Sequence, residues 1–299
     1  MRILVTGGAG FIGSNLVHAL VGRHDVGVID DLSTGSPANL HPAAWHRTLD
    51  VLDGSFALAV AEFGPDAIVH LAAQVSVAVS VREPERDRLV NVEGTRAAAR
   101  AAAACGCARM LSASSAAVYG EPQTLPMPET HPKSPQSPYG ASKLEAESVL
   151  AAELAGTGVD FASLRFANVY GPRQDANGEA GVVAIFCDAI RADGEPVVFG
   201  DGHQTRDFIY VGDVVDAVIT ALEHEGPLAD DGIDGPAYNI GTGERTSVDA
   251  LVAGLRLAAR WTGAVAHGPE RAGDVEHSAL DPAKAAAVLG WRARVPLET

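Results

Sequence analysis

A tyrosine and a lysine four residues apart are the side chains of this sequence best suited to acid–base chemistry. Tyr139 and Lys143 stand in the segment YGASK, and residues four apart on a helix project from the same face. An ammonium group beside a phenol favours the phenolate, so it lowers the pKa of the tyrosine. Such a tyrosine can remove a proton from a hydroxyl group, or return it, near neutral pH. The same spacing is also typical of a plain helix surface pair, so a second observation is needed.

A glycine-rich segment near the N-terminus supplies that observation. The stretch TGGAGFIG follows an apolar strand pattern and matches G-x-G-x-x-G through its second, third and fourth glycines. Glycines at this spacing allow a tight turn and a close approach of the main chain to a pyrophosphate at a helix N-terminus. An ordinary turn between strand and helix is the alternative. The residues expected to bind a dinucleotide are Gly7, Gly10, Phe11, Ile12 and Gly13.

The next strand pattern, VGVID, ends at Asp30. A carboxylate at this place accepts hydrogen bonds from the adenine ribose of a dinucleotide. Asp30 and its neighbour Asp31 would repel a 2′-phosphate, and no arginine follows in DLSTG. The sequence therefore predicts NAD rather than NADP as the cofactor.

A parallel sheet is needed to bring these groups together. Up to about residue 167, β-branched runs alternate with Ala- and Leu-rich stretches of helical character, a pattern typical of helices on both faces of a sheet. We predict an α/β fold with a Rossmann-type doubly wound parallel sheet and a smaller C-terminal α/β substrate lobe. The expected boundaries are 1–167 for the NAD-binding domain and 168–299 for the substrate lobe, with 205–224 returning to the first domain. The predicted strands are RILVT, VGVID, AIVHLA, RMLSAS and FASLRF.

The composition argues against several classes of partner. The chain has 299 residues and a formal net charge of -16, which repels nucleic acid. It has neither a signal-peptide pattern nor eighteen consecutive apolar residues, so we expect a cytoplasmic protein without a membrane partner. Three cysteines and ten scattered histidines provide no disulfide framework and no metal-ligand spacing, so no metal is expected. Pro296 is typical of the first turn of a helix, and a further C-terminal helix is expected.

The chain resembles the extended short-chain dehydrogenase/reductase family, and its UDP-glucose 4-epimerases in particular, over nearly all of its length. The matching stretches are TGGAGFIG, LAAQVSV, SSAAVYG, YGASK, LRFANVYGPRQ, RDFIYV, YNIGTG and RAGD. The resemblance implies that Ser115 hydrogen-bonds the reacting hydroxyl, that Tyr139 is the acid/base, and that Lys143 binds the nicotinamide ribose while tuning Tyr139. It implies further cofactor contacts from Asp50, Val51, Leu71, Ala72, Ala73 and Gln74. It implies substrate contacts from Asn168, Arg206, Arg271, Asp274 and Ser278.

Two alanines favour epimerisation over related reactions. Family members that dehydrate or decarboxylate the ketosugar have an acidic residue between the catalytic hydroxyl and VYG, where this chain has Ala116 and Ala117. We therefore expect NAD-dependent inversion of C4 of a UDP- or dTDP-hexose through a transient 4-ketosugar, with NAD recycled. Asn168 favours a neutral hexose. Ser278, smaller than the tyrosine of strictly glucose/galactose-specific members, predicts that 2-acetamido sugars also enter. Gln74 replaces a lysine that touches NAD in some epimerases, which predicts weaker retention of NAD.

Two alternative functions stay open at this point. A nucleotide-sugar 4-ketoreductase or dehydrogenase would use the same three catalytic side chains but release a changed cofactor. A non-catalytic dinucleotide sensor would keep the fold without the reaction. The resemblance also implies a homodimer that pairs the helices around 91–105 and 139–154.

Overall fold

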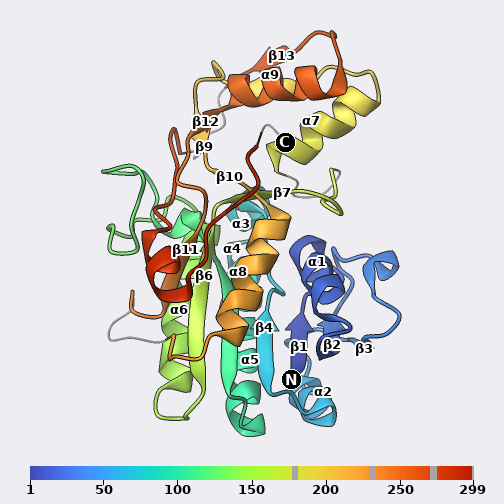
Figure 1. Ribbon diagram of the computed structural model, residues 1–299, viewed down its shortest axis with the longest axis vertical. Coiled ribbons are helices and arrows are strands. Elements are labelled where there is room, and N and C mark those ends of the chain that lie inside the picture. Colours follow the sequence, from blue (N-terminus) through green and yellow to red (C-terminus); the bar gives the residue numbers. More distant parts are fainter. Residues whose placement is uncertain (177–180, 229–233, 270–274, 298–299) are drawn as a thin grey trace.

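The apolar runs of the first half of the chain pair side by side in one parallel sheet. The computed structural model describes residues 1–176, 181–228, 234–269 and 275–297. Its strands are β1 (Arg2–Thr6), β2 (Asp25–Asp30), β3 (Trp45–Thr48), β4 (Ala67–His70), β5 (Arg109–Ser115), β6 (Asp160–Phe166), β7 (Asn168–Tyr170), β8 (Val197–Phe199), β9 (Thr205–Arg206), β10 (Phe208–Tyr210), β11 (Ala237–Ile240), β12 (Thr246–Ser247) and β13 (Ala266–Gly268). Its α-helices are α1 (Phe11–Leu20), α2 (Phe56–Phe63), α3 (Val77–Arg82), α4 (Pro84–Arg88), α5 (Gly94–Cys105), α6 (Pro138–Leu154), α7 (Val182–Arg191), α8 (Val211–Glu223) and α9 (Val248–Ala259). The main sheet has seven strands in the order β11-β6-β5-β4-β1-β2-β3 (Figure 1).

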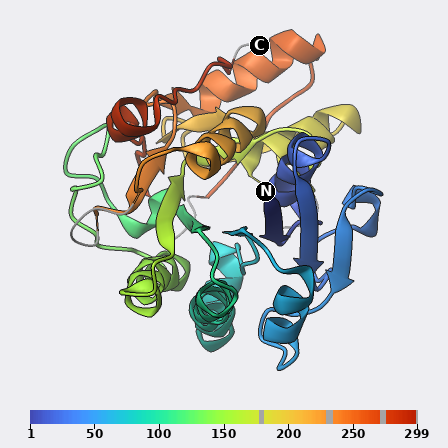
Figure 2. The same ribbon diagram turned by 60° about the horizontal axis from the view of Figure 1, so that its bottom comes forward.

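Helices cover both faces of this sheet, as the predicted doubly wound fold requires. Side chains alternate across a strand, so Ile3 and Val5 of β1 pack into the core cluster that includes α1 and α8. Leu4, between them, packs into the cluster that includes α2 and α5. Figure 2 shows α2, α5 and α6 on one face and α1 and α8 on the other. The apolar composition of each strand therefore follows from burial on both sides.

Elements from the second half of the chain also belong to this sheet. β11 pairs with β6 in parallel as an outer strand, and buried residues of α8 share a core cluster with β1 and β4. The strand before α8, β10, pairs with β7 instead of joining the main sheet. β3 and β11 were not predicted, because WHRT and AYNI are too short and too polar to form an apolar run. The domain boundary at residue 167 stays a prediction.

The smaller lobe lies beyond the carboxyl ends of the main strands (Figure 1). It contains α7, α9 and the parallel pair of β8 with β13, and it has a core of its own. This core includes Phe186, Val198, Phe208 and Leu251, all less than 10% exposed. Across the described ranges of the chain, the helices are too short or too polar to cross a bilayer.

Candidate active site

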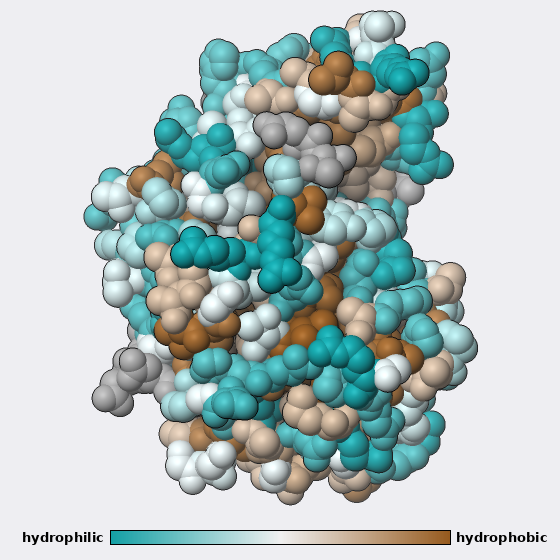
Figure 3. Space-filling view, viewed as in Figure 1, coloured by the Kyte–Doolittle hydropathy of each residue, from teal (hydrophilic) through white to brown (hydrophobic). Residues whose placement is uncertain are grey.

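The predicted site residues gather at one edge of the sheet because the strands before them are parallel neighbours. Gly7 follows β1, Leu71 follows β4, and Asp30 and Ser115 end β2 and β5. Asn168 comes two residues after Phe166, the register partner of Ser115. Carboxyl ends of adjacent parallel strands form the usual ligand site of such a fold. Figure 3 shows the outline indented between the smaller lobe and the part of the molecule that holds β1–β3.

The glycine-rich loop is packed so tightly that side chains are excluded from it. Gly7 has a φ of 71°, and a Cβ there would lie 2.7 Å from the backbone nitrogen of Ala72. A Cβ on Gly13 would lie 2.1 Å from the carbonyl oxygen of Gly7. Gly10 caps α1 without a side-chain hydrogen bond, and Phe11 and Ile12 begin the helix. The N–H groups of the first turn are therefore not capped by a side chain, which fits a helix that faces a diphosphate.

Gly13→Ala is expected to weaken NAD binding about ten- to hundredfold, because the added methyl group meets a backbone oxygen that a rotamer change cannot move. NAD titration by calorimetry measures the effect. Gly254→Ala is the matched control, since a Cβ there meets nothing within 4 Å. It lies inside α9 and should stabilise the protein by about 0.5–1 kcal/mol without changing NAD affinity. Equal NAD affinity in the two variants would contradict the assignment of this loop.

Asp30 links the glycine-rich loop to the loop after β2. Its Oδ2 accepts from the backbone N–H of Ala9 and its Oδ1 from that of Leu32, each at 2.8 Å. Asp30 is 7% exposed, and burial raises the pKa of its carboxyl despite these two donors. Each oxygen keeps a lone pair for a ribose hydroxyl. Asp31 is exposed and accepts from the backbone N–H and hydroxyl of Ser33.

The predicted adenine contacts come from the loop after β3. Asp50 is exposed, and its Oδ1 accepts from the backbone N–H of Leu52 at 2.9 Å. Val51 is 6% exposed and packs in the cluster that includes α2 and α5. Core packing therefore accounts for much of Val51, and its contact with adenine stays a prediction.

Four half-buried residues follow β4 at the edge of the sheet predicted to bind the cofactor. They are Leu71, Ala72, Ala73 and Gln74. The backbone N–H of Leu71 donates to the carbonyl oxygen of Thr6 at 3.1 Å, which holds the segment beside the glycine-rich loop. The Gln74 amide is bound within the protein, because its Nε2 donates to Asp87 at 2.5 Å and to the Ser76 carbonyl at 2.9 Å.

A close approach of α6 to the end of β5 brings two of the three predicted catalytic side chains together. Ser137 caps α6 by accepting from the N–H of Gly140 at 3.1 Å, and Pro138 occupies the first turn. A Cβ on Gly140 would lie 2.5 Å from the carbonyl oxygen of Ala117, so a glycine permits this contact. The Ser115 side chain is near enough to the Tyr139 phenol to act on its pKa, in the direction of a lower pKa.

Lys143 lies one helical turn after Tyr139 on α6. It is 6% exposed, its Nζ donates to the carbonyl oxygen of Ala113 at 3.0 Å, and Nζ is 6.0 Å from the centre of the Tyr139 ring. Burial lowers the pKa of Lys143 to about 8. The expected lowering of the Tyr139 pKa is wrong for this structure. Burial raises the pKa of Tyr139 and outweighs the opposing effect of the Ser115 side chain.

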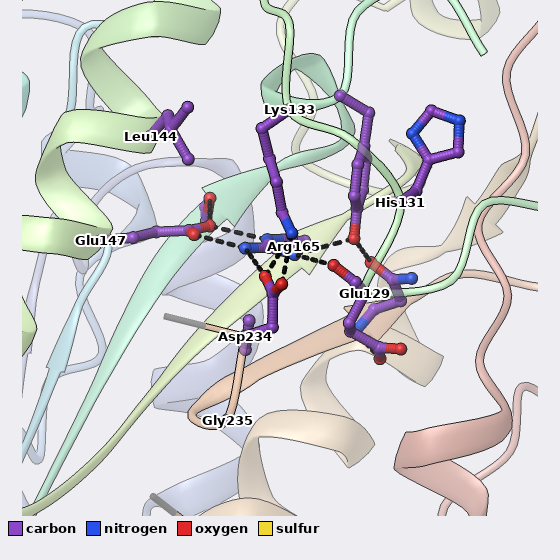
Figure 4. A network of polar contacts seen from close by, with 12 residues as sticks. Glu129, His131, Lys133, Leu144, Glu147, Arg165, Asp234 and Gly235 are labelled. Atoms are coloured by element: carbon purple, nitrogen blue, oxygen red, sulfur yellow. Dashed lines mark hydrogen bonds and ion pairs between the residues drawn. The ribbon is translucent and has the colours of Figure 1, made fainter. Parts of the chain in front are cut away.

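A buried arginine of β6 is the register partner of Ser114, the residue before Ser115 on β5, and forms a network of polar contacts (Figure 4). Arg165 of β6 is 0% exposed, and its Nε and Nη2 donate to the two oxygens of Glu147 at 2.9 and 2.6 Å. Its Nη1 donates to the hydroxyl of Tyr119 at 2.9 Å. Glu147, one turn after Lys143, also accepts from the hydroxyl of Ser114 at 2.5 Å. The network ties α6 to β5 and β6, and no sequence motif signals it.

Three of the predicted substrate residues are connected by hydrogen bonds to residues 205–207 or to their neighbours. The backbone N–H of Asn168 donates to the carbonyl oxygen of Asp207 at 2.9 Å. Arg206 lies next to Asp207 and donates to the carbonyl oxygens of Thr205 and Glu276 at 3.0 and 3.2 Å. The N–H of Ser278 donates to Thr205 at 3.1 Å. Arg271 and Asp274 lie outside the described residues.

His70 and Asp87 were not predicted, although both are buried at this site. The Nδ1 of His70 lies 2.8 Å from the Thr6 hydroxyl, while its Nε2 has no partner among the described residues. Burial lowers the pKa of His70 to about 3, with a further contribution from Lys143, so this imidazole is neutral. Neither residue belongs to a motif that would have revealed it. Within the described ranges, no three His, Cys, Asp or Glu residues are grouped to hold a metal ion.

A family model described as the NAD dependent epimerase/dehydratase family matches residues 3–241. The chain belongs to this family. The UDP-glucose 4-epimerase of Mycolicibacterium smegmatis is 43% identical over an alignment 304 residues long, which covers 99% of this chain and 95% of that protein. The solved structure of the UDP-glucose 4-epimerase of Thermotoga maritima with UDP-glucose superposes with a TM-score of 0.94 and is 40% identical in sequence. The match covers 100% of this chain and 95% of that chain. The UDP-glucose 4-epimerase of Thermus thermophilus, in complex with NAD, is 39% identical at a TM-score of 0.91, with 100% and 96% covered. The family resemblance, the Rossmann-type fold and the use of NAD are confirmed.

Proposed function

We propose that this member of the NAD-dependent epimerase/dehydratase family inverts C4 of a nucleotide-diphosphate hexose, with UDP-glucose and UDP-galactose as substrates. The observation that supports this best is that the Ser115 side chain and the buried ammonium of Lys143 both lie close to Tyr139. All three lie at the sheet edge that also holds the glycine-rich loop. The proteins to which this chain is similar are UDP-glucose 4-epimerases, named for this reaction.

The residues of this edge fit NAD. The loop around Gly7 and Gly13 has no space for a Cβ, so its backbone can approach a diphosphate, while Asp30 would hold the adenine ribose and Lys143 the nicotinamide ribose. Bound NAD supplies the hydride acceptor for C4, the hydride that returns to it, and a positive charge near the phenol.

The chain's own residues handle the proton of the sugar. Tyr139 accepts the proton of the 4-hydroxyl as C4 is oxidised. It returns the proton after the ketosugar has rotated in the site and presents its opposite face to the cofactor. Ser115 holds the reacting oxygen through its hydroxyl. The Lys143 ammonium stabilises the phenolate that forms, which is needed because burial raises the pKa of Tyr139.

The short turn after β5 favours return of the hydride over elimination. Ala116 and Ala117 form the turn that follows Ser115, and Ala116 packs against an apolar cluster with Val118 and Leu280. A methyl group cannot protonate a leaving 6-hydroxyl. Return of the hydride to C4 is therefore favoured over elimination of the 6-hydroxyl.

A panel of nucleotide sugars, with and without added NAD, tests this proposal. We expect UDP-glucose and UDP-galactose to interconvert, with products identified by NMR and no net change of nicotinamide absorbance. Formation of NADH in proportion to product would instead indicate a dehydrogenase, and consumption of added NADH with a 4-ketosugar would indicate a ketoreductase. Binding of NAD without any turnover across UDP- and dTDP-sugars would favour a sensor.

The position of Ser278 extends the proposal to 2-acetamido sugars. Ser278 is half-buried beside β9, and a serine leaves more room there than a tyrosine. We expect the native protein to turn over UDP-N-acetylglucosamine, and Ser278→Tyr to reduce that kcat/KM about ten- to hundredfold through steric overlap while UDP-glucose activity persists. Ser278→Ala is the control and should keep both activities. A native protein active on UDP-glucose but inactive on the acetamido sugar would exclude this extension.

We also propose a cytoplasmic homodimer. α5 and α6 lie side by side on one face of the sheet (Figure 2), and nearby α3 and the turn before α5 expose Val81 at 64% and Leu89 at 50%. These features support pairing of the α5 and α6 faces across a twofold axis. Light scattering coupled to gel filtration tests it, and a monomer at micromolar concentration would contradict it.

A further inference from the structure

A fully buried carboxylate lies behind the catalytic tyrosine and lysine. Asp87 of α4 is 0% exposed. Its Oδ1 accepts from Nε2 of Gln74 at 2.5 Å and from Nδ2 of Asn91 at 3.2 Å. Its Oδ2 is buried without a hydrogen-bond partner among the described residues. A buried charge with an unsatisfied oxygen is costly for folding, which points to a role beyond stability.

Hydrogen bonds connect Asp87 to both sides of the site. Asn91 accepts from the backbone N–H of Gln74 at 2.9 Å, on the cofactor edge after β4. The same amide donates to the hydroxyl of Ser142 at 3.0 Å, and Ser142 donates to the carbonyl oxygen of Tyr139 at 3.0 Å. The carboxylate is therefore held in a fixed place relative to the first turn of α6.

The negative charge of Asp87 acts on both titrating groups of α6. It raises the pKa of Tyr139, and it opposes the lowering of the Lys143 pKa by burial. Glu147 also acts on Lys143, but the Arg165 guanidinium compensates its charge.

The other charged groups near α4 have partners or face solvent. His70, from β4, is neutral because its pKa is about 3. Arg88 of α4 pairs with Glu145 of α6 at the surface. Arg86 pairs with Glu83, and both side chains are exposed. Further groups are the exposed Arg82 of α3 and Glu85 of α4, and the surface pair of Glu93 with Arg96.

We propose that Asp87 is a positioning residue that sets the pH range in which Tyr139 and Lys143 work as a pair. Its fixed carboxylate is the counter-charge that keeps Lys143 protonated beside the phenol. The role of Asp87 in catalysis rests on the proposed function. Its electrostatic effect on Tyr139 and Lys143 can be measured without turnover.

Asp87→Asn tests the proposal because it removes the charge at nearly constant shape. Loss of the negative charge lowers the pKa of Tyr139 and that of Lys143, so both limbs of the pH profile of kcat/KM should move to lower pH by about half a unit to one unit. Glu85→Gln removes an exposed carboxylate from the same helix and should leave the profile unchanged. Asp87→Ser, a second neutral substitution with room for water, should shift the profile in the same direction.

A measurement without substrate separates this inference from the proposed function. Tyrosinate absorbance is titrated in the native protein and in Asp87→Asn, each against a matched Tyr139→Phe background, so that Tyr139 alone is observed. A lower Tyr139 pKa in Asp87→Asn supports the inference even if no sugar is turned over. An unchanged Tyr139 pKa in Asp87→Asn would overturn it, whatever the activity of the native protein.

Discussion

Tyr139→Phe is expected to lower kcat about 10³-fold while NAD binds as in the native protein. The substitution removes only the hydroxyl group that lies near Ser115 and that would exchange the proton of the sugar. The ring stays, so the packing of α6 against the turn after β5 should persist. Rates of UDP-glucose turnover and NAD titrations on the same preparations measure the two effects.

Tyr238→Phe is the matched control for this experiment. Tyr238 of β11 is 2% exposed, and its hydroxyl donates to the carbonyl oxygen of Leu228 at 3.0 Å. Its loss should cost about 1 kcal/mol of stability and leave kcat unchanged. If Tyr139→Phe kept its native kcat, another group would be the acid/base and the proposed mechanism would be wrong.

Arg165→Met is expected to lower the free energy of unfolding by about 3–5 kcal/mol, because it leaves the Glu147 carboxylate buried without its cation. Glu147 is 5% exposed and cannot recover its hydration. Chemical denaturation measures the loss. The double variant Arg165→Met with Glu147→Gln should be more stable than the single one, since it removes the unpaired charge.

A pair whose arginine is exposed, and whose carboxylate keeps Arg96 as a second partner, gives the comparison. Arg100 binds Glu153 at 2.9 Å, but its side chain is 65% exposed, so Arg100→Met should cost at most about 1 kcal/mol. Similar losses for Arg165→Met and Arg100→Met would show that burial adds nothing to the Arg165 pair.

The sequence by itself determined the features that depend on neighbouring residues. The glycine-rich stretch predicted the turn between β1 and α1, because spacing along the chain sets which residues must lack a Cβ. The spacing of Tyr139 and Lys143 predicted one helix face, since the helical repeat alone decides it. Apolar runs predicted β1, β2, β4, β5 and β6, and the fold followed from their alternation with helices.

Only the tertiary structure decided what depends on residues far apart in the chain. β3 and β11 form by pairing with strands already present, so their own composition gives little signal. The pKa of Tyr139 follows from burial, which the local pattern of a helix does not reveal, and the sequence expectation for it had the wrong sign. Asp87 and Arg165 look like ordinary surface charges in the sequence. Packing of α4, α6 and β6 makes them buried, because burial is a property of all the surrounding elements together.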